Sequence, residues 1–235
     1  MSAVADAKRL VVKVGTSTLT YENGRLNLRR IESLVKVLSD LKNAGREIVL
    51  VTSGAIGVGA GHLGLKERPR DIGGKQAAAA VGQCELMYTY DKQFSEYGHV
   101  TAQVLLTRDV VEDDRRKSNV VNTLCRLLEY GAVPIINEND TVATEEIEFG
   151  DNDTLSALVA ELVGADALVL LTDIDGLYDA DPHQNPDAHP IPEVRIIDQN
   201  LLKLAGGAGS NRGTGGMVTK LHAAEIAMAA GIPAV

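Results

Sequence analysis

Five short apolar runs recur along the chain, and they are separated by longer stretches with a different spacing of apolar residues. The runs are four to seven residues long and rich in Val, Ile and Leu, which is typical of buried strands. They comprise Arg9–Val14, Glu47–Thr52, Val100–Leu106, Val133–Ile136 and Ala167–Leu171. A further strand begins at Gly231 and runs into the last residue, Val235.

The stretches between these runs place apolar residues every three to four positions, which predicts amphipathic helices. These stretches are Leu28–Ala44, Lys75–Tyr97, Asn119–Tyr130, Asn152–Val163 and Met217–Ala230. Gly45, Gly131 and Gly164 each directly follow one of these stretches and are expected to end the helix.

The alternation of strands and helices predicts an α/β fold, a three-layer α/β/α sandwich with an open, mostly parallel central sheet. No internal repeat and no linker divides the chain, so residues 1–235 are expected to form one domain. The core must be aliphatic, because the chain holds no Trp and two Phe.

Polar side chains follow several of the predicted strands, and the carboxyl ends of parallel strands meet at one edge of a sheet. Ligands of open α/β sheets bind at that edge. The residues expected there are Lys13, Ser53, Asn137, Asp140, Thr172 and Asp173. Their coincidence at one edge is stronger evidence for a site than any one motif.

Two clusters of short acids and amides flank a region of alternating polarity, Thr141–Phe149, which is predicted to be a hairpin. The first cluster, Asn137–Asp140, ends a strand, and the second, Gly150–Thr154, precedes a helix. Each cluster taken alone also fits a structural role, as a turn in the first case and as a helix cap at Asp151 or Asn152 in the second.

Two lysines at opposite ends of the chain are candidates for binding phosphate. Lys13 interrupts an apolar strand and is followed by Gly-Thr-Ser, although it could also be an edge-strand lysine with its head in water. Lys220 lies one turn into a helix that follows a glycine-rich loop, Gly206–Gly216, and the alternative is a surface lysine. The sequence is not a Walker A loop, because G-x-x-x-x-G-K-[ST] is absent.

These lysines suggest a scheme for phosphoryl transfer, which needs in-line positioning and positive charge around the transferred group. Lys13 and Lys220 could supply the charge, and Asp153 could hold the two ammonium groups apart. A metal ion carried by the nucleotide would complete the clamp, and a carboxylate substrate would need no general base.

One glycine motif is misleading. Gly59–Gly64 matches G-x-G-x-x-G, but the preceding strand ends seven residues earlier, at Thr52, and no acidic residue follows at the required distance. We therefore interpret the match as accidental and expect the functional part of this segment to be Ser53-Gly54, whose N–H groups could bind a carboxylate.

Composition excludes several classes of protein. A net charge of −9 and the lack of a basic run argue against nucleic-acid binding. The five histidines are scattered and no C-x-x-C occurs, so no protein-built metal site is expected. Cys84 and Cys125 are predicted to be reduced core residues of a cytosolic protein. No signal-type stretch and no membrane-spanning run is present in the sequence.

The motifs VVKVGTSTL, VTSGAI, PIINENDTVAT, FGDNDTLSA, LLTDIDGLY and GTGGMVTK, in that order, closely resemble those of the glutamate 5-kinases of the amino-acid kinase superfamily. The resemblance covers nearly the whole chain. It implies ATP-dependent phosphorylation of the γ-carboxylate of L-glutamate to L-glutamyl 5-phosphate, the first step of L-proline synthesis, with Mg²⁺ carried by the nucleotide.

The resemblance also implies roles for individual residues. Lys13 would contact the ATP phosphates, Lys220 would stabilise the moving phosphoryl group, and Asp153 would organise both. The implied glutamate ligands are Ser53, Asp140 and Asn152, with Gly54, Asn137 and Asp151 nearby. The implied nucleotide site comprises Thr172, Asp173, Thr214, Gly215, Gly216, Met217, Val218, Thr219 and Lys220.

By the same resemblance the protein would be a cytoplasmic homodimer or homotetramer that L-proline inhibits near Thr141–Phe149 and that passes its product to glutamyl phosphate reductase. The kinase domain of the family continues beyond the point where this chain ends, and many members add a PUA domain. We therefore expect residues 1–235 to be a kinase domain truncated at its C-terminus.

Other functions remain open at this level. Sister kinases act on N-acetylglutamate, aspartate, carbamate or a nucleoside monophosphate, but the acids near Asn137–Asp153 favour a free amino acid with its α-ammonium group. A non-catalytic amino-acid sensor is disfavoured by the presence of both Lys13 and Lys220. A nicotinamide dehydrogenase would rest only on Gly59–Gly64 and ranks last.

Overall fold

A five-stranded parallel sheet forms the centre of the protein, seen here in a computed structural model that describes residues 2–107, 109–142, 152–180, 182, 185–206 and 216–235. The strands are β1 (Arg9–Val14), β2 (Glu47–Val51), β3 (Thr101–Leu106), β4 (Val133–Glu138) and β5 (Ala167–Leu171). Their order across the sheet is β3-β4-β2-β1-β5, and every pairing between them is parallel. All five strands follow the predicted apolar runs to within two residues at each end, and the α/β sandwich is confirmed.

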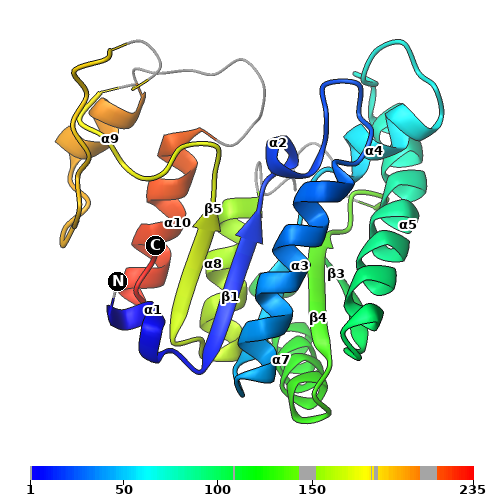
Figure 1. The fold of residues 1–235 in the computed structure, drawn as a ribbon, viewed down its shortest axis with the longest axis horizontal. Helices are drawn as coiled ribbons and strands as arrows, with labels where there is room; N and C mark the ends of the chain where they lie inside the picture. The colour runs from blue at the N-terminus through cyan, green and yellow to red at the C-terminus, as the bar shows by residue number, and fades with distance from the viewer. Residues whose placement is uncertain (1, 108, 143–151, 181, 183–184, 207–215) are drawn as a thin grey trace.

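Strand β1 lies inside the sheet, between β2 and β5, and Figure 1 shows β5 beside it. Lys13 pairs in register with Val51 on one side and Leu170 on the other, so it is not an edge-strand residue. The end of the chain continues the sheet beyond β5, because Leu168 N–H donates to Pro233 O and Val235 N–H donates to Leu168 O, each at 2.9 Å. The predicted strand at Gly231–Val235 is therefore present as a short parallel bridge.

Helices cover both faces of the sheet. The first face carries α3 (Leu28–Asn43), α4 (Ala55–His62) and α5 (Ile72–Glu96), and the second carries α7 (Asp114–Glu129), α8 (Asn152–Val163) and α10 (Met217–Ala229). Side chains alternate along a strand, so Leu10, Val12 and Val14 pack with the first set of helices while Val11 packs with the second. This makes a three-layer sandwich with one aliphatic core on each side of the sheet.

Local signals explain where the helices begin and end. The side chains of Asn27, Asp71 and Asp113 accept hydrogen bonds from backbone N–H groups at the starts of α3, α5 and α7. The three glycines predicted to end helices adopt the left-handed conformation, with φ of 89° at Gly45, 73° at Gly131 and 59° at Gly164.

The helix predictions are correct in kind and less accurate in extent. Helix α5 begins at Ile72 rather than Lys75, and α7 begins at Asp114 rather than Asn119. Helix α4 was not predicted at all, because three glycines in eight residues hide its helical character. Four further helices are too short for a helical spacing of apolar residues to predict them. They are α1 (Ser2–Asp6), α2 (Thr16–Leu19), α6 (Asp109–Glu112) and α9 (Gln199–Gly206).

The prediction of core positions for both cysteines was wrong. Cys84 is exposed and Cys125 is half-buried, because α5 and α7 turn other residues toward the sheet. The predicted hairpin at Thr141–Phe149 lies outside the described residues except for Thr141 and Val142. Across the described helices, none is both long enough and apolar enough to span a membrane.

Candidate active site

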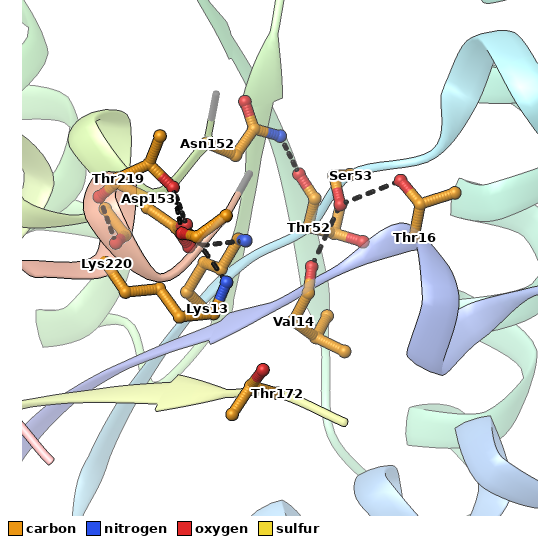
Figure 2. A network of polar contacts seen from close by, with 12 residues as sticks. Lys13, Val14, Thr16, Thr52, Ser53, Asn152, Asp153, Thr172, Thr219 and Lys220 are labelled. Carbon is orange, nitrogen blue, oxygen red and sulfur yellow. Dashed lines mark hydrogen bonds and ion pairs between the residues drawn. The ribbon is translucent and has the colours of Figure 1, made fainter. Parts of the chain in front are cut away.

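A buried aspartate joins the two lysines that the sequence singled out. Asp153 has no exposed surface, and its Oδ1 lies 2.5 Å from Lys13 Nζ while its Oδ2 lies 3.4 Å from Lys220 Nζ (Figure 2). Lys13 is only 5% exposed. The two ammonium groups therefore meet at one carboxylate, although the lysines come from β1 and α10, near opposite ends of the chain.

Three elements hold this group. Lys13 points from the central strand toward the helices of the second face, Asp153 occupies the first turn of α8, and Lys220 the first turn of α10. Thr219 adds a hydrogen bond from Oγ1 to Asp153 Oδ2 at 3.0 Å. A carboxylate is favoured in the first turn of α8 because the N-terminus of a helix carries partial positive charge.

Opposing effects set the protonation state of Asp153. Burial alone would raise the pKa of this carboxyl, but the charges of Lys13 and Lys220, with hydrogen bonds from Lys13 and Thr219, bring the pKa below its ordinary value of 3.8. Asp153 is thus negatively charged at neutral pH and can hold both lysines in place.

A cavity of about 760 Å³ lies at the carboxyl edge of the sheet, beside this group. Of the six residues predicted to bind substrate, five line it, namely Ser53, Gly54, Asn137, Asp140 and Asn152. The sixth, Asp151, lies outside the described residues. Asn152, which lines the cavity, directly precedes Asp153, so the cavity and the two lysines share the start of α8.

Chain topology explains why a cavity opens here. After β2 the chain passes to α4 on the first face, and after β4 it reaches α8 on the second face. Strands β2 and β4 are neighbours in the sheet. Neighbouring strands whose connections leave in opposite directions create a crevice at their carboxyl ends, and Ser53 and Asn137 lie at that point.

The walls of the cavity are held by hydrogen bonds. Ser53 Oγ donates to Val14 O at 3.1 Å and accepts from Thr16 Oγ1 at 3.3 Å (Figure 2). Gly54 caps α4 with φ of 97°, a conformation that a residue with a Cβ rarely adopts. Asn152 Nδ2 donates to Thr52 O and, at 2.8 Å, to Asn137 Oδ1.

The sequence interpretation missed one wall of the cavity. It is formed by the segment between α4 and α5 and the start of α5, which contribute Glu67, Arg68, Pro69, Arg70 and Lys75. Thr16 and Glu138 also line the cavity. A run of charged residues between two helices, 66–71, was the available signal, but such runs are usually solvated surface.

Among the described residues, those expected to bind nucleotide do not line this cavity. Thr172 and Asp173 follow β5 and line a second cavity of about 580 Å³, together with Tyr21, Arg29 and Arg30. Gly216 caps α10, and Met217, Val218, Thr219 and Lys220 form its first turn. Thr214 and Gly215 lie outside the described residues.

The rejected dinucleotide motif has a structural role. Most of Gly59–Gly64 lies within α4 and its cap. A Cβ at Gly59 would lie 1.8 Å from Ala78 O in α5, so this glycine permits the two helices to cross closely. No phosphate-binding loop is present at this position.

Within the described residues, no group of three or more His, Cys, Asp or Glu is placed to hold a metal ion. Asp153, the most buried acid of the site, is engaged by Lys13 and Lys220. The part of the site that the structure describes therefore contains no such cluster.

Comparisons with known proteins agree with this architecture. A model of the amino acid kinase family matches residues 8–235. Glutamate 5-kinase from Clostridium perfringens (strain 13 / Type A) is 60% identical over 234 residues, which are 98% of this chain and 87% of that protein. Glutamate 5-kinase from Moorella thermoacetica is 59% identical over 233 residues, which are 99% of this chain but 62% of that protein.

Solved structures with low sequence identity share the fold. Carbamate kinase from Giardia lamblia bound to AMP-PNP has a TM-score of 0.66 at 15% identity, covering 98% of this chain and 92% of that one. The product complex of T. acidophilum isopentenyl phosphate kinase has a TM-score of 0.61 at 21% identity, covering 94% and 87%. The chain therefore belongs to the amino acid kinase family, and the two relatives described above are glutamate 5-kinases.

Proposed function

We propose that this protein transfers the γ-phosphoryl group of ATP to the γ-carboxylate of L-glutamate, giving L-glutamyl 5-phosphate for L-proline synthesis. The observation that carries the proposal is the meeting of Lys13 and Lys220 at the buried Asp153, next to a polar cavity. Relatives named glutamate 5-kinase support the choice of substrate.

The cavity suits an acidic amino acid because it carries charges of both signs. Arg68, Arg70 and Lys75 can attract carboxylates, while Asp140 can pair with an α-ammonium group. Ser53 and Asn152 would complete the glutamate ligands, with Gly54 and Asn137 nearby and Asp151 as the remaining predicted contact. An acetylated amine carries no positive charge with which Asp140 could pair.

The transfer itself asks the protein for position and charge. A γ-carboxylate oxygen of glutamate forms a bond to the γ-phosphorus of ATP, the bond from that phosphorus to the bridging oxygen breaks, and ADP leaves. The carboxylate is already a nucleophile, so no side chain has to remove a proton. Lys13 and Lys220 would offset the negative charge that spreads over the phosphoryl oxygens in the transition state.

Asp153 would keep the two lysines correctly aimed, since two close ammonium groups without a carboxylate between them would repel each other. Thr172, Asp173 and Thr214–Lys220 would contact the nucleotide. Mg²⁺ would arrive bound to the ATP phosphates as part of the substrate.

Several wider properties belong to the same proposal. The protein would act in the cytoplasm as a homodimer or homotetramer and would pass its labile product to glutamyl phosphate reductase. L-Proline would inhibit by competing around the glutamate site. Residues 1–235 would be the kinase domain of the protein.

A hydroxylamine assay tests the function directly. ATP, Mg²⁺, L-glutamate and hydroxylamine should give γ-glutamyl hydroxamate, which the colour of its ferric complex reports, because hydroxylamine traps the acyl phosphate. Parallel reactions contain N-acetylglutamate, aspartate or carbamate, and a control omits ATP. Turnover of one of these alternatives without turnover of glutamate would contradict the proposal.

A further inference from the structure

A chain of buried amides connects helix α5 to the wall of the substrate cavity. Gln83 Oε1 accepts a hydrogen bond from Asn137 Nδ2 at 2.8 Å, and Asn137 Oδ1 accepts from Asn152 Nδ2 at 2.8 Å. All three side chains are buried, with exposed fractions of 8% for Gln83, 2% for Asn137 and 8% for Asn152. Of these three amide residues, Asn137 and Asn152 line the cavity and Gln83 does not.

Backbone groups fix the direction of the hydrogen bonds between these three amides. Glu138 N–H, which can only donate, donates to Asn137 Oδ1 at 2.9 Å. Thr52 O, which can only accept, receives a bond from Asn152 Nδ2 (Figure 2). Asn137 must therefore turn its NH₂ group toward α5, and only an acceptor at position 83 can satisfy it.

The useful atom of the Gln83 amide is its oxygen, which accepts a hydrogen bond, and not its nitrogen. Its Nε2 is buried and, among the described residues, has no hydrogen-bond partner. An unpaired buried NH₂ group is unfavourable. If the side chain only filled space, an apolar residue of the same size would be more stable at position 83. Its one described hydrogen bond orients Asn137.

Helix α5 also supports Thr52, the residue that accepts a hydrogen bond from Asn152 at the other end of this series of amides. Thr52 Oγ1 and Tyr90 OH share a hydrogen bond of 3.0 Å, and Thr52 N–H donates to Ile136 O at 2.9 Å. Burial raises the pKa of Tyr90 against the lowering effect of this hydrogen bond, so the phenol stays protonated. The carbonyl of Thr52 is thus a fixed acceptor for Asn152.

We infer that Gln83 is a positioning residue that sets the orientation of Asn137 and Asn152 in the substrate cavity, and thereby the affinity for the acidic substrate. This inference rests on the proposed function. Without an acceptor at position 83, the buried NH₂ group of Asn137 loses its hydrogen bond to α5, and Asn137 is held less firmly against Asn152. Lys13 and Lys220 lie outside this chain of amides, so the phosphoryl-transfer step should change little.

The test is a double-mutant cycle on the full chain with the hydroxamate assay. Gln83→Met, which keeps the size of the side chain and removes the acceptor, should raise KM for glutamate about tenfold and leave kcat and KM for ATP within about twofold. In an Asn137→Ala background the same substitution should have no further effect, because Gln83 acts through Asn137. Gln93→Met, on the same helix and outside the cavity, is the matched control and should behave like the wild type.

The outcomes separate the inference from the function on which it rests. The inference alone is wrong if the wild type turns over glutamate but the effects of Gln83→Met and Asn137→Ala are additive. It is also wrong if Gln83→Met changes KM for glutamate and KM for ATP equally. A wild type that makes no γ-glutamyl hydroxamate overturns the proposed function and this inference together. If Gln83→Met does not fold, Gln83→Asn removes the acceptor from reach of Asn137 and replaces it in the cycle.

Discussion

Asp153 is the residue on which the proposed chemistry depends most. It is fully buried, it contacts two lysines from different elements, and its neighbour Asn152 faces the substrate cavity. The position thus connects the two lysines with the wall of the cavity that we propose binds glutamate. Because a buried carboxylate is costly without partners, the burial of Asp153 depends on the two lysines that contact it.

Lys220 should act in the transition state more than in substrate binding. Lys220→Ala is expected to lower kcat by at least about 100-fold and to change KM for glutamate by less than about threefold, because negative charge on the phosphoryl oxygens develops during transfer. Steady-state kinetics in the hydroxamate assay measure both constants. Lys36→Ala, at an exposed position on α3, is the control, and a large rise in KM with an unchanged kcat would refute the role given to Lys220.

Asp153 should also make stability depend on pH in acid. A carboxyl whose pKa is lower in the folded state binds fewer protons there, so it stabilises the fold above its ordinary pKa of 3.8. This contribution is lost as the pH falls toward the lowered pKa of the folded state.

Urea unfolding of the wild type and of Asp153→Asn, measured from pH 7 to pH 3, checks this expectation. The variant should be less stable at pH 7 by about 3–5 kcal/mol, because Lys13 is left buried without its counter-charge. The difference between the two proteins should be constant above about pH 5 and shrink below pH 3.8. A difference that grows on acidification would contradict the lowered pKa.

Helices α4 and α5 cross so closely that two glycines are needed at the contact. A Cβ at Gly59 would lie 1.8 Å from Ala78 O, and a Cβ at Gly82 would lie 1.8 Å from Ala55 O. The same helices present Gly54, Ala55, Ile56 and Lys75 to the cavity. The close crossing therefore sets how far these two walls of the substrate cavity stand apart.

Gly59→Ala and Gly82→Ala should each destabilise the protein by about 1–3 kcal/mol or more, because a methyl group has to displace backbone atoms. Gly57→Ala in the same helix is the matched control, since its Cβ would meet Thr16 Cγ2 at an ordinary 3.9 Å. Thermal and urea unfolding measure the effect. Equal stability of the three variants would show that the helices can separate without cost.

Across the whole molecule, the order of the strands creates the site. The order β3-β4-β2-β1-β5 places the ends of β2 and β4 side by side while their connections leave toward opposite faces. It also places β1, with Lys13, next to β5 and within reach of α8 and α10. The acceptor cavity and the two lysines are consequently neighbours at one edge of the sheet.

The sequence alone determined the layers of this protein, because short continuous apolar runs specify strands buried on both faces and a spacing of about 3.6 residues specifies helices with one buried face. It also located Lys13, Ser53, Asn137 and Asp140 at strand ends. Only the tertiary structure decided that Lys13 and Lys220 share Asp153, that Arg68 and Lys75 face the cavity, and that Gln83 orients Asn137. These facts depend on contacts between elements far apart in the chain, and a local pattern encodes burial but not the partner across the contact.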